Sequence, residues 1–330
     1  MPCHPGGQRP IGPGGHDNRT MENSRIVLYA SYQTGKELPG YVRFALQHLS
    51  ETPFRIVLLT NKRELSPETL AFLQERNIFL YLTENHGFDF GMWRRFLKDL
   101  ANGRGNFTTL SGISRLVLMN DSIVYYRNRF QEFFERAERS DADAVSLTEN
   151  NEVRHHLQSY FLYLKQEALG AFFMHLLETP EQDSYYDVVH RLEIGMAGAF
   201  EDAEVRTEAL YPTKRNVLFT YPELVTGGAG FIKRRTLQQR FSISEKAHFI
   251  RHRALTALNA DYRKMIVESG LAEDFKEEWL PTPTDGALHR AADKLWENTF
   301  DKVGWPLLRK AIKTKYKLLG KKLEGEEYNN

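Results

Sequence analysis

The sequence predicts an α/β protein whose core is a mostly parallel sheet covered by helices. After Met21, short runs rich in Val, Ile and Leu recur along the chain, and stretches with helical spacing follow them. Continuous apolar runs of this kind are typical of strands that helices bury on both faces. With 330 residues, 41% of them hydrophobic, the chain is long enough to bury a large core. The predicted strands cover residues 25–30, 55–60, 78–82, 116–119, 144–148 and 155–164.

Helices are predicted between these strands. Residues 39–49 place apolar side chains three and four positions apart, which fits a helix with one face on the sheet. A second helix, 66–76, opens with Ser66 as the capping residue and Pro67 at the first helical position. A third helix is expected to end near Leu100, and a fourth to cover residues 129–140.

The two ends of the chain differ from this middle part. The first twenty residues hold five Gly and four Pro, so we expect a disordered lead over residues 1–22. The one cysteine, Cys3, falls in this lead, which excludes an internal disulfide and makes a catalytic cysteine unexpected. Residues 23–243 are predicted to form the α/β domain and residues 244–330 a helical extension. No apolar run reaches the roughly 18 residues that a membrane span requires.

The charge of the chain is unevenly placed. Lys and Arg number 44 against 43 Asp and Glu, a net charge of +1, which argues against nucleic acid as a partner. The segment from Lys302 to Lys322 nevertheless contains eight Lys or Arg and no acid. With Trp305 and several leucines it reads as a basic amphipathic helix, which predicts attachment to an anionic membrane surface. The alternative is a helix that docks its apolar stripe on the domain and leaves its basic face in water.

Polar residues follow the first and fourth predicted strands at the point where each ends. These residues are Ser31 and Tyr32 after the first strand, and Asn120, Asp121 and Ser122 after the fourth. Open α/β sheets bind ligands at the carboxyl ends of their strands, so we expect a site here. Asp121 with its oxygen-bearing neighbours suits Mg²⁺ or Mn²⁺. The alternative is a plain turn, because Asn, Asp and Ser are common turn residues.

The segment after the third strand is more unusual. Gly87 and Gly91 bracket one carboxylate, Asp89, that lies between two phenylalanines, and Asn85 and Trp93 stand on either side. Aromatic side chains stack on sugars or bases in binding pockets, where Asp89 would accept hydrogen bonds from sugar hydroxyls. The alternative is that the aromatic residues belong to the core and that Asp89 caps a helix.

Two later segments carry further candidates. In residues 155–164 the strand period places His156 and Gln158 on one face, toward either a pocket or solvent. A zinc site is not expected there, because the histidines lack an acidic partner at helical spacing. Glu193 lies between apolar residues and precedes a run of small ones, which suits a general base. The alternative is an exposed glutamate on a helix. The glycine-rich segment that ends at Lys233 lacks the spacing of a phosphate-binding loop.

The order of these motifs resembles the rhamnan synthesis F family, a family of bacterial glycosyltransferases of polysaccharide and O-antigen assembly. Each motif alone is weak, but their joint order over residues 25–235 makes the resemblance fairly specific. The motifs are Tyr41-Val42, Glu84 to Trp93, Met119 to Ser122, His156 to Leu162, Leu192 to Gly195 and Phe231 to Lys233.

This resemblance implies a GT-A-like enzyme that takes its sugar from a nucleotide-diphospho-sugar, with dTDP-L-rhamnose as the donor that the family name suggests. By the same resemblance, Asp121 stands at the metal motif and Glu193 at the position of the base in inverting enzymes. Only one acid remains at the metal motif, so the resemblance leaves metal dependence open. Lys233 or an arginine would then supply part of the missing positive charge.

The resemblance also implies roles for the other candidates and a place of action. His156, Gln158 and Ser159 would line the cleft between donor and acceptor. The acceptor would be a glycan or a polyprenyl-linked glycan, met at the inner face of the bacterial cytoplasmic membrane. The residues that would hold the donor and its nucleotide are Ser31, Tyr32, Asn85, Gly87, Asp89, Trp93, Asn120, Ser122 and Lys233.

Three alternatives stay open at this point. The enzyme could use another nucleotide sugar, because pocket shape decides the donor. The chain could be a non-catalytic sugar-nucleotide or glycan-binding subunit of a synthase complex. It could also be a mononucleotide-binding α/β protein unrelated to sugars. A nicotinamide dehydrogenase and a serine hydrolase are disfavoured, since neither GxGxxG nor GxSxG follows a predicted strand.

Overall fold

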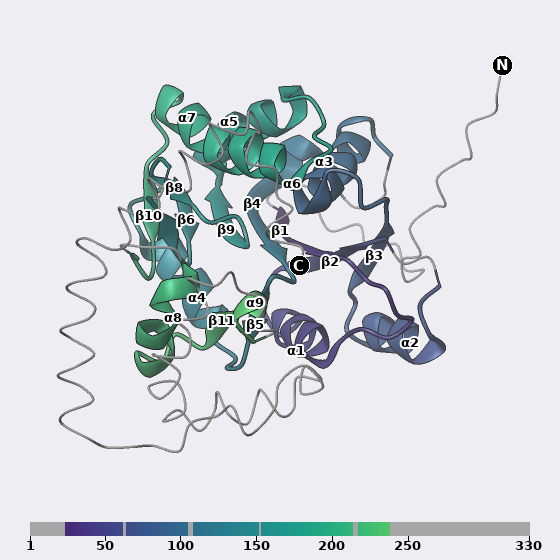
Figure 1. Cartoon of the computed structure of the whole chain (residues 1–330). Coiled ribbons are helices and arrows are strands. Elements are labelled where there is room, and N and C mark those ends of the chain that lie inside the picture. The colour runs from purple at the N-terminus through teal and green to yellow at the C-terminus, as the bar shows by residue number, and fades with distance from the viewer. Residues whose placement is uncertain (1–23, 62–63, 105–107, 152, 214–216, 238–330) are drawn as a thin grey trace, which may run out of the picture.

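The computed structural model describes residues 24–61, 64–104, 108–151, 153–213 and 217–237. A seven-stranded sheet forms its centre, in the order β10-β6-β9-β4-β1-β2-β3 (Figure 1). Strand β9 runs antiparallel to both of its neighbours, and the other six strands are parallel to one another. The strands of this sheet are β1 (Ser24–Ser31), β2 (Arg55–Thr60), β3 (Phe79–Leu82), β4 (Ile113–Asn120), β6 (Ala144–Ser146), β9 (Phe161–Lys165) and β10 (Thr207–Ala209).

Two small antiparallel pairs border the sheet. Strand β5 (Ile123–Tyr125) pairs with β11 (Phe231–Lys233), and β7 (Glu149–Asn150) pairs with β8 (His156–Leu157). The first pair matters for the site, because it brings Lys233 and the residue after it beside the turn that follows β4.

Helices cover both faces of the sheet (Figure 1). On one face pack α1 (Gly40–Leu49), α2 (Pro67–Glu75), α4 (Phe130–Arg139) and α8 (Val217–Thr226). On the other face pack α3 (Phe88–Ala101), α5 (Gln166–Glu178), the π-helical turn η2 (Val188–Glu193) and α7 (Ile194–Asp202). The remaining short elements are η1 (Leu110–Gly112), α6 (Tyr185–Asp187) and α9 (Arg234–Leu237).

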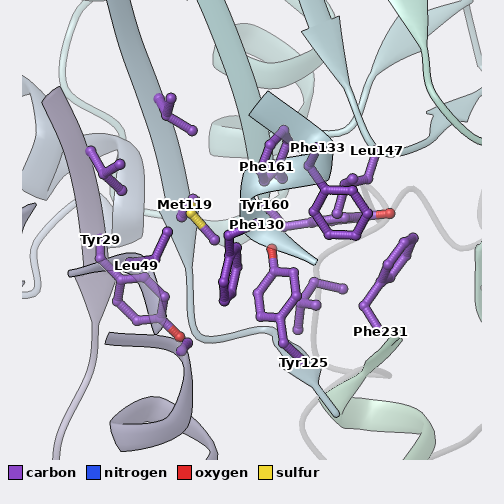
Figure 2. Packing of buried hydrophobic residues seen from close by; sticks show 14 of the residues in the cluster. Tyr29, Leu49, Met119, Tyr125, Phe130, Phe133, Leu147, Tyr160, Phe161 and Phe231 are labelled. Atoms are coloured by element: carbon purple, nitrogen blue, oxygen red, sulfur yellow. The ribbon is translucent and has the colours of Figure 1, made fainter. Parts of the chain in front are cut away.

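The core is divided into two parts by the sheet. Along β1, Val27 and Tyr29 belong to the part under α1, whereas Ile26 and Leu28 belong to the part under α3. This alternation follows from the two-residue period of a strand. Figure 2 shows the part on the α1 side, which is rich in aromatic rings such as Tyr125, Phe133 and Phe231.

The α/β class with a mostly parallel sheet flanked by helices is confirmed, and the first five predicted strands occur with shifts of a few residues. The cap of α2 is also as predicted, since the Ser66 side chain accepts a hydrogen bond from the Thr69 N–H at 3.1 Å. The predicted lead (1–22), the helical extension (244–330) and both domain boundaries lie outside the described residues. Within those residues, no helix is both long and apolar enough to cross a bilayer.

One strand prediction was wrong. Residues 155–164 form β8 and β9 with a turn between them, and not one strand. The turn arises because the Gln158 N–H is bonded to the Thr148 carbonyl at 3.0 Å and the Ser159 N–H to the Glu193 carboxylate at 2.8 Å. The two-residue period therefore does not carry across this segment.

The structure also corrects the prediction for the aromatic residues in the segment after the third predicted strand. Helix α3 begins already at Phe88, so Phe90 and Trp93 lie on the face that packs against the sheet. Trp93 is fully buried, and its ring meets Phe90 edge to face at 5.0 Å between centroids. Trp93 is thus a core residue, as the alternative interpretation had it, and its indole has no surface to offer to a ligand.

Candidate active site

The turn after β4 forms the centre of the candidate site. Asn120 and Asp121 are both 8% exposed, and the Asp121 N–H donates to the Ala30 carbonyl at 3.1 Å. The Asn120 Oδ1 accepts from both the backbone N–H and the hydroxyl of Ser122, at 3.1 and 2.6 Å. These bonds fix the turn so that Asn120 and Asp121 have defined and different directions.

Asn120 points toward an acidic group formed by Asp89 and Glu193. The Asn120 Nδ2 donates to Asp89 Oδ2, and the Phe90 N–H donates to Asp89 Oδ1 at 3.0 Å. Burial, with a further contribution from the neighbouring Glu193, raises the pKa of Asp89 to about 6. Ionisation of Asp89 is therefore unfavourable in the folded protein, and a second carboxylate, that of Glu193, lies close.

Glu193 is held in place from the opposite side. It ends the π-helical turn η2, and its Oε1 accepts the Ser159 N–H at 2.8 Å. Turns of π-helix inside longer helices are often found at functional sites. The bond to Ser159 orients the carboxylate, and the predicted cleft residue Ser159 contributes its backbone N–H to this contact.

The backbone that carries Asp89 has unusual geometry. Gly87 and Phe88 both have positive φ angles, 70° and 56°. A positive φ is uncommon for an aromatic residue, and such strain is concentrated at functional sites. At Gly91, any Cβ would overlap the backbone carbonyl of His86. The two glycines of the segment are therefore required for the tight approach that turns Asp89 toward Asn120.

Asp121 points to the other face of the sheet, toward Arg234. Its Oδ2 lies 3.3 Å from Arg234 Nη1 and accepts the Ser31 hydroxyl at 2.9 Å. The Tyr32 backbone also donates to this carboxylate. Burial raises the pKa of Asp121, while Arg234 and Ser31 oppose the shift. Arg234 also donates to the Tyr41 hydroxyl at 2.6 Å.

Lys233 ends β11 and Arg234 follows it, and these two consecutive cations are called the cationic group. The Lys233 Nζ lies 5.4 Å from the centre of the Tyr160 ring, while Arg234 faces Asp121 and Tyr41. Burial raises the pKa of the Tyr160 hydroxyl, and the nearby Glu193 carboxylate adds to this shift. The cationic group therefore borders the same edge of the sheet as the acidic group.

The other predicted residues lie around this edge in different ways. Tyr32 is 52% exposed directly after β1, which leaves its ring open to a ligand. His156 and Gln158 are buried, and the His156 Nδ1 pairs with the Arg154 carbonyl at 2.8 Å. Asn85 is half-buried in the loop before α3. For these residues the binding roles stay predictions.

The donor set at Asp121 does not fit a divalent cation. Its Oδ2 already serves Ser31 and Arg234, and a metal ion bound there would stand beside the guanidinium and be repelled. Across the described ranges, no three or more His, Cys, Asp or Glu side chains group as metal ligands would. Asp121 has the surroundings of an anchor for Arg234.

Sequence comparison decides the family. The model of the family described as rhamnan synthesis protein F matches residues 56–277. The chain belongs to this family. The resemblance carried by the motifs is thereby confirmed, and the protein is a glycosyltransferase, as the family implies. A search of curated protein sequences gives no significant match.

Several solved structures are similar to this chain at low sequence identity. A cytidylyltransferase from Leptospira borgpetersenii is 12% identical, with a TM-score of 0.37 over 73% of this chain and 97% of its own. A glycosyltransferase involved in glycosylation of the major capsid of PBCV-1 is 11% identical, with 0.35 over 67% and 98%. A mannosyltransferase from Pyrobaculum calidifontis, solved with GDP-Man and Mn²⁺, is 9% identical, with 0.37 over 84% and 89%. The assignment rests on the family match and not on these similarities.

Sequence reasoning missed the role of Arg234. The expectation named Lys233 or an unspecified arginine as a source of positive charge, and the structure gives the contact with Asp121 to Arg234. The available signal was the run of three basic residues, Lys233 to Arg235, after the glycine-rich segment. Successive residues leave a strand in opposite directions, so only one of the first two could meet Asp121.

Proposed function

We propose that this family member transfers a sugar from a nucleotide-diphospho-sugar to a hydroxyl of a glycan acceptor, with inversion at the anomeric carbon. The observation that carries the proposal is the separation of charge at one sheet edge. The acidic group Asp89 and Glu193 lies on one side of the turn after β4, where Asn120 meets Asp89, and Arg234 lies on the other side against Asp121, with Lys233 nearby at the Tyr160 ring. A transferase needs a base at one end of its substrate and a positive charge at the leaving diphosphate.

The chemistry is a single displacement. The Glu193 carboxylate removes the proton from the acceptor hydroxyl, and that oxygen forms a bond to the anomeric carbon. The bond between this carbon and the diphosphate oxygen breaks, and its electron pair leaves with the nucleoside diphosphate. Arg234 and Lys233 stabilise the charge on the diphosphate, and Asp89 adds negative charge beside the sugar, where positive charge develops.

For the donor we propose dTDP-L-rhamnose, on the strength of the family assignment. The exposed ring of Tyr32 after β1 is placed to stack on a nucleobase, a contact that any base can make. A different nucleotide sugar is therefore the alternative to test beside it.

For the acceptor we propose a glycan or polyprenyl-linked glycan at the inner face of the cytoplasmic membrane. The support is the basic segment from Lys302 to Lys322, with eight Lys or Arg and no acid, since such segments bind anionic lipid surfaces. Sedimentation with anionic liposomes, comparing the full chain with one truncated after Asp301, tests the location. We expect only the full chain to sediment, and equal partitioning of the two would contradict membrane attachment.

The proposed function is tested on the purified full chain with a panel of nucleotide sugars. A ligand that binds only the folded state raises the melting temperature, so the donor should stand out in a thermal-shift screen. Release of free nucleoside diphosphate from the same donor then separates an enzyme from a binding subunit. Binding without any turnover, with or without acceptor glycans, would favour the non-catalytic subunit, and binding of no nucleotide sugar would reject the proposal.

A further inference from the structure

Arg234 contacts the turn after β4 through both its backbone and its side chain. Its N–H donates to the Ser122 carbonyl at 2.8 Å, and its Nη1 lies 3.3 Å from Asp121 Oδ2. The same Nη1 donates to the Tyr41 hydroxyl at 2.6 Å. The guanidinium is thus held at the carboxyl ends of β1 and β4, where a ligand of an open α/β sheet binds.

The surroundings of Arg234 favour a fixed positive charge. Burial lowers the pKa of its guanidinium, but Asp121 and Tyr41 outweigh burial and the net shift is upward. Asp121 is itself held by the Ser31 hydroxyl at 2.9 Å, and Ser31 accepts a hydrogen bond from Gln33. A chain of polar contacts therefore fixes the position of the one acid to which the sequence assigned a metal.

We propose that Arg234 takes the place of a divalent cation beside Asp121, so that the chain binds the diphosphate of its donor without a metal ion. The inference rests on the proposed function for the identity of the ligand, a nucleoside diphosphate. Arg234 supplies one positive charge beside Asp121, and the preceding residue Lys233 supplies a second at the Tyr160 ring. The guanidinium contacts with Asp121 and Tyr41 both use Nη1, and the planar guanidinium carries further donors on Nη2 and Nε that suit phosphate oxygens.

Asp121 then has a different role from the one that the sequence predicted. It is a positioning residue that orients Arg234 and does not itself touch the ligand. Its contacts to Ser31, Tyr32 and Arg234 all serve this purpose.

The first arm of the test uses Mn²⁺ alone and does not depend on the proposed function. The full chain is stripped with EDTA, and Mn²⁺ binding is followed by electron paramagnetic resonance for wild type and Asp121→Asn. We expect no Mn²⁺ site that depends on Asp121. Mn²⁺ binding by wild type that Asp121→Asn removes would overturn the inference.

The second arm measures the affinity for dTDP and UDP by calorimetry, with and without Mn²⁺. Wild type is expected to bind its preferred nucleotide equally well in both conditions. Arg234→Met should bind about 10-fold to 100-fold more weakly without metal, because charge-assisted hydrogen bonds to phosphate are lost. Mn²⁺ should partly restore the affinity of this variant, since Asp121 is then open to a cation. A wild type that binds only with Mn²⁺ would overturn the inference.

Control variants show whether a loss of nucleotide affinity is specific to the Arg234 guanidinium. Arg43→Met removes an arginine on the neighbouring helix α1 whose ion-pair partners are Glu37 and Glu68, and it should leave nucleotide affinity unchanged. Arg234→Lys keeps the charge without the planar fork, so it should fall between wild type and Arg234→Met even if the latter folds poorly. If neither these two nucleotides nor any nucleotide sugar of the panel binds in any condition, the proposed function fails, and the Mn²⁺ arm still decides whether Arg234 excludes a metal.

Discussion

The acidic and the cationic groups of the site begin at two consecutive residues, Asn120 and Asp121. Asn120 has the parity of Leu116 and Leu118 on β4, so it faces α3 and meets Asp89. Asp121 has the parity of Met119, so it faces α1 and meets Arg234. One short turn thus directs one side chain to the acidic group and the next to Arg234, because neighbouring residues of a strand point in opposite directions.

The two groups also differ in how their charges are balanced. Asp121 is neutralised by a cation and two hydrogen-bond donors, which is the pattern of a structural anchor. Asp89 has amide donors but a second carboxylate, Glu193, as its neighbour, and its pKa rises to about 6. Unfavourable charge that persists in a fold indicates a functional demand. In the proposed mechanism, the chemistry therefore belongs to the acidic group and substrate binding to the cationic group.

Replacing the base should have the largest effect on the rate. Glu193→Gln keeps the size of the side chain and the hydrogen bond from Ser159 but cannot take a proton. We expect kcat for transfer to fall by about 1000-fold, in the range of a lost general base. Steady-state kinetics measure it, with Glu201→Gln on the exposed end of α7 as a matched control. Near-normal turnover of Glu193→Gln would remove Glu193 as the base.

Distorting the backbone that carries Asp89 should disrupt the acidic group and leave the cationic group intact. Gly91→Ala places a methyl group against the His86 carbonyl, so the turn before α3 must shift. We expect a loss of about 3 kcal/mol in the free energy of unfolding, typical of overpacking, together with a kcat that falls about 100-fold. Thermal melts and kinetics measure both effects.

Gly170→Ala serves as its control. No atom lies within 4 Å of a Cβ at Gly170 on α5, so this change should stabilise the helix by about 0.5–1 kcal/mol and leave the rate unchanged. The account of the Gly87–Gly91 turn would be wrong if Gly91→Ala matched Gly170→Ala in stability and rate.

Neutralising Asp89 should lower activity and raise stability. Its folded-state pKa of about 6 lies above the ordinary value of 3.8, so the ionised form is disfavoured by folding. The cost is absent below about pH 4, grows as the pH rises from 4 to 6, and stays constant at higher pH. We expect Asp89→Asn to melt about 2–4 °C higher than wild type at pH 8, to match it near pH 4, and to lose about tenfold in kcat. A variant that is less stable than wild type at pH 8 would show that the charge is not strained.

The strands could be predicted from sequence because their signal is local. Runs such as Arg55–Thr60 are apolar on both faces and become strands wherever two layers of helix cover them. The reversed direction of β9 was not predicted, since no local feature of Phe161–Lys165 distinguishes a parallel from an antiparallel strand. The break before it depends on Glu193, which is distant in the sequence and reaches the Ser159 N–H.

The sequence predicted which residues belong to the site better than it predicted the contacts that each of them makes. Asp121 and Glu193 were singled out from their position near strand ends and small residues, but their partners came from elsewhere in the chain. The contact between Arg234 and Asp121 follows from the pairing of β11 with β5, a tertiary feature that no spacing rule contains. Trp93 was misassigned because its role depends on the residue at which α3 begins, and helix starts are set by such details as the positive φ of Phe88.

In the proposed mechanism, the cationic group binds the diphosphate and the acidic group does not. This difference is tested most directly by the affinity for the nucleoside diphosphate product, measured by calorimetry on two variants. Glu193→Gln should bind dTDP, or whichever nucleotide wild type prefers, with the wild-type dissociation constant, because the acidic group does not hold the diphosphate. Arg234→Met should bind it at least about tenfold more weakly. Equal losses in the two variants, or a loss confined to Glu193→Gln, would contradict the account.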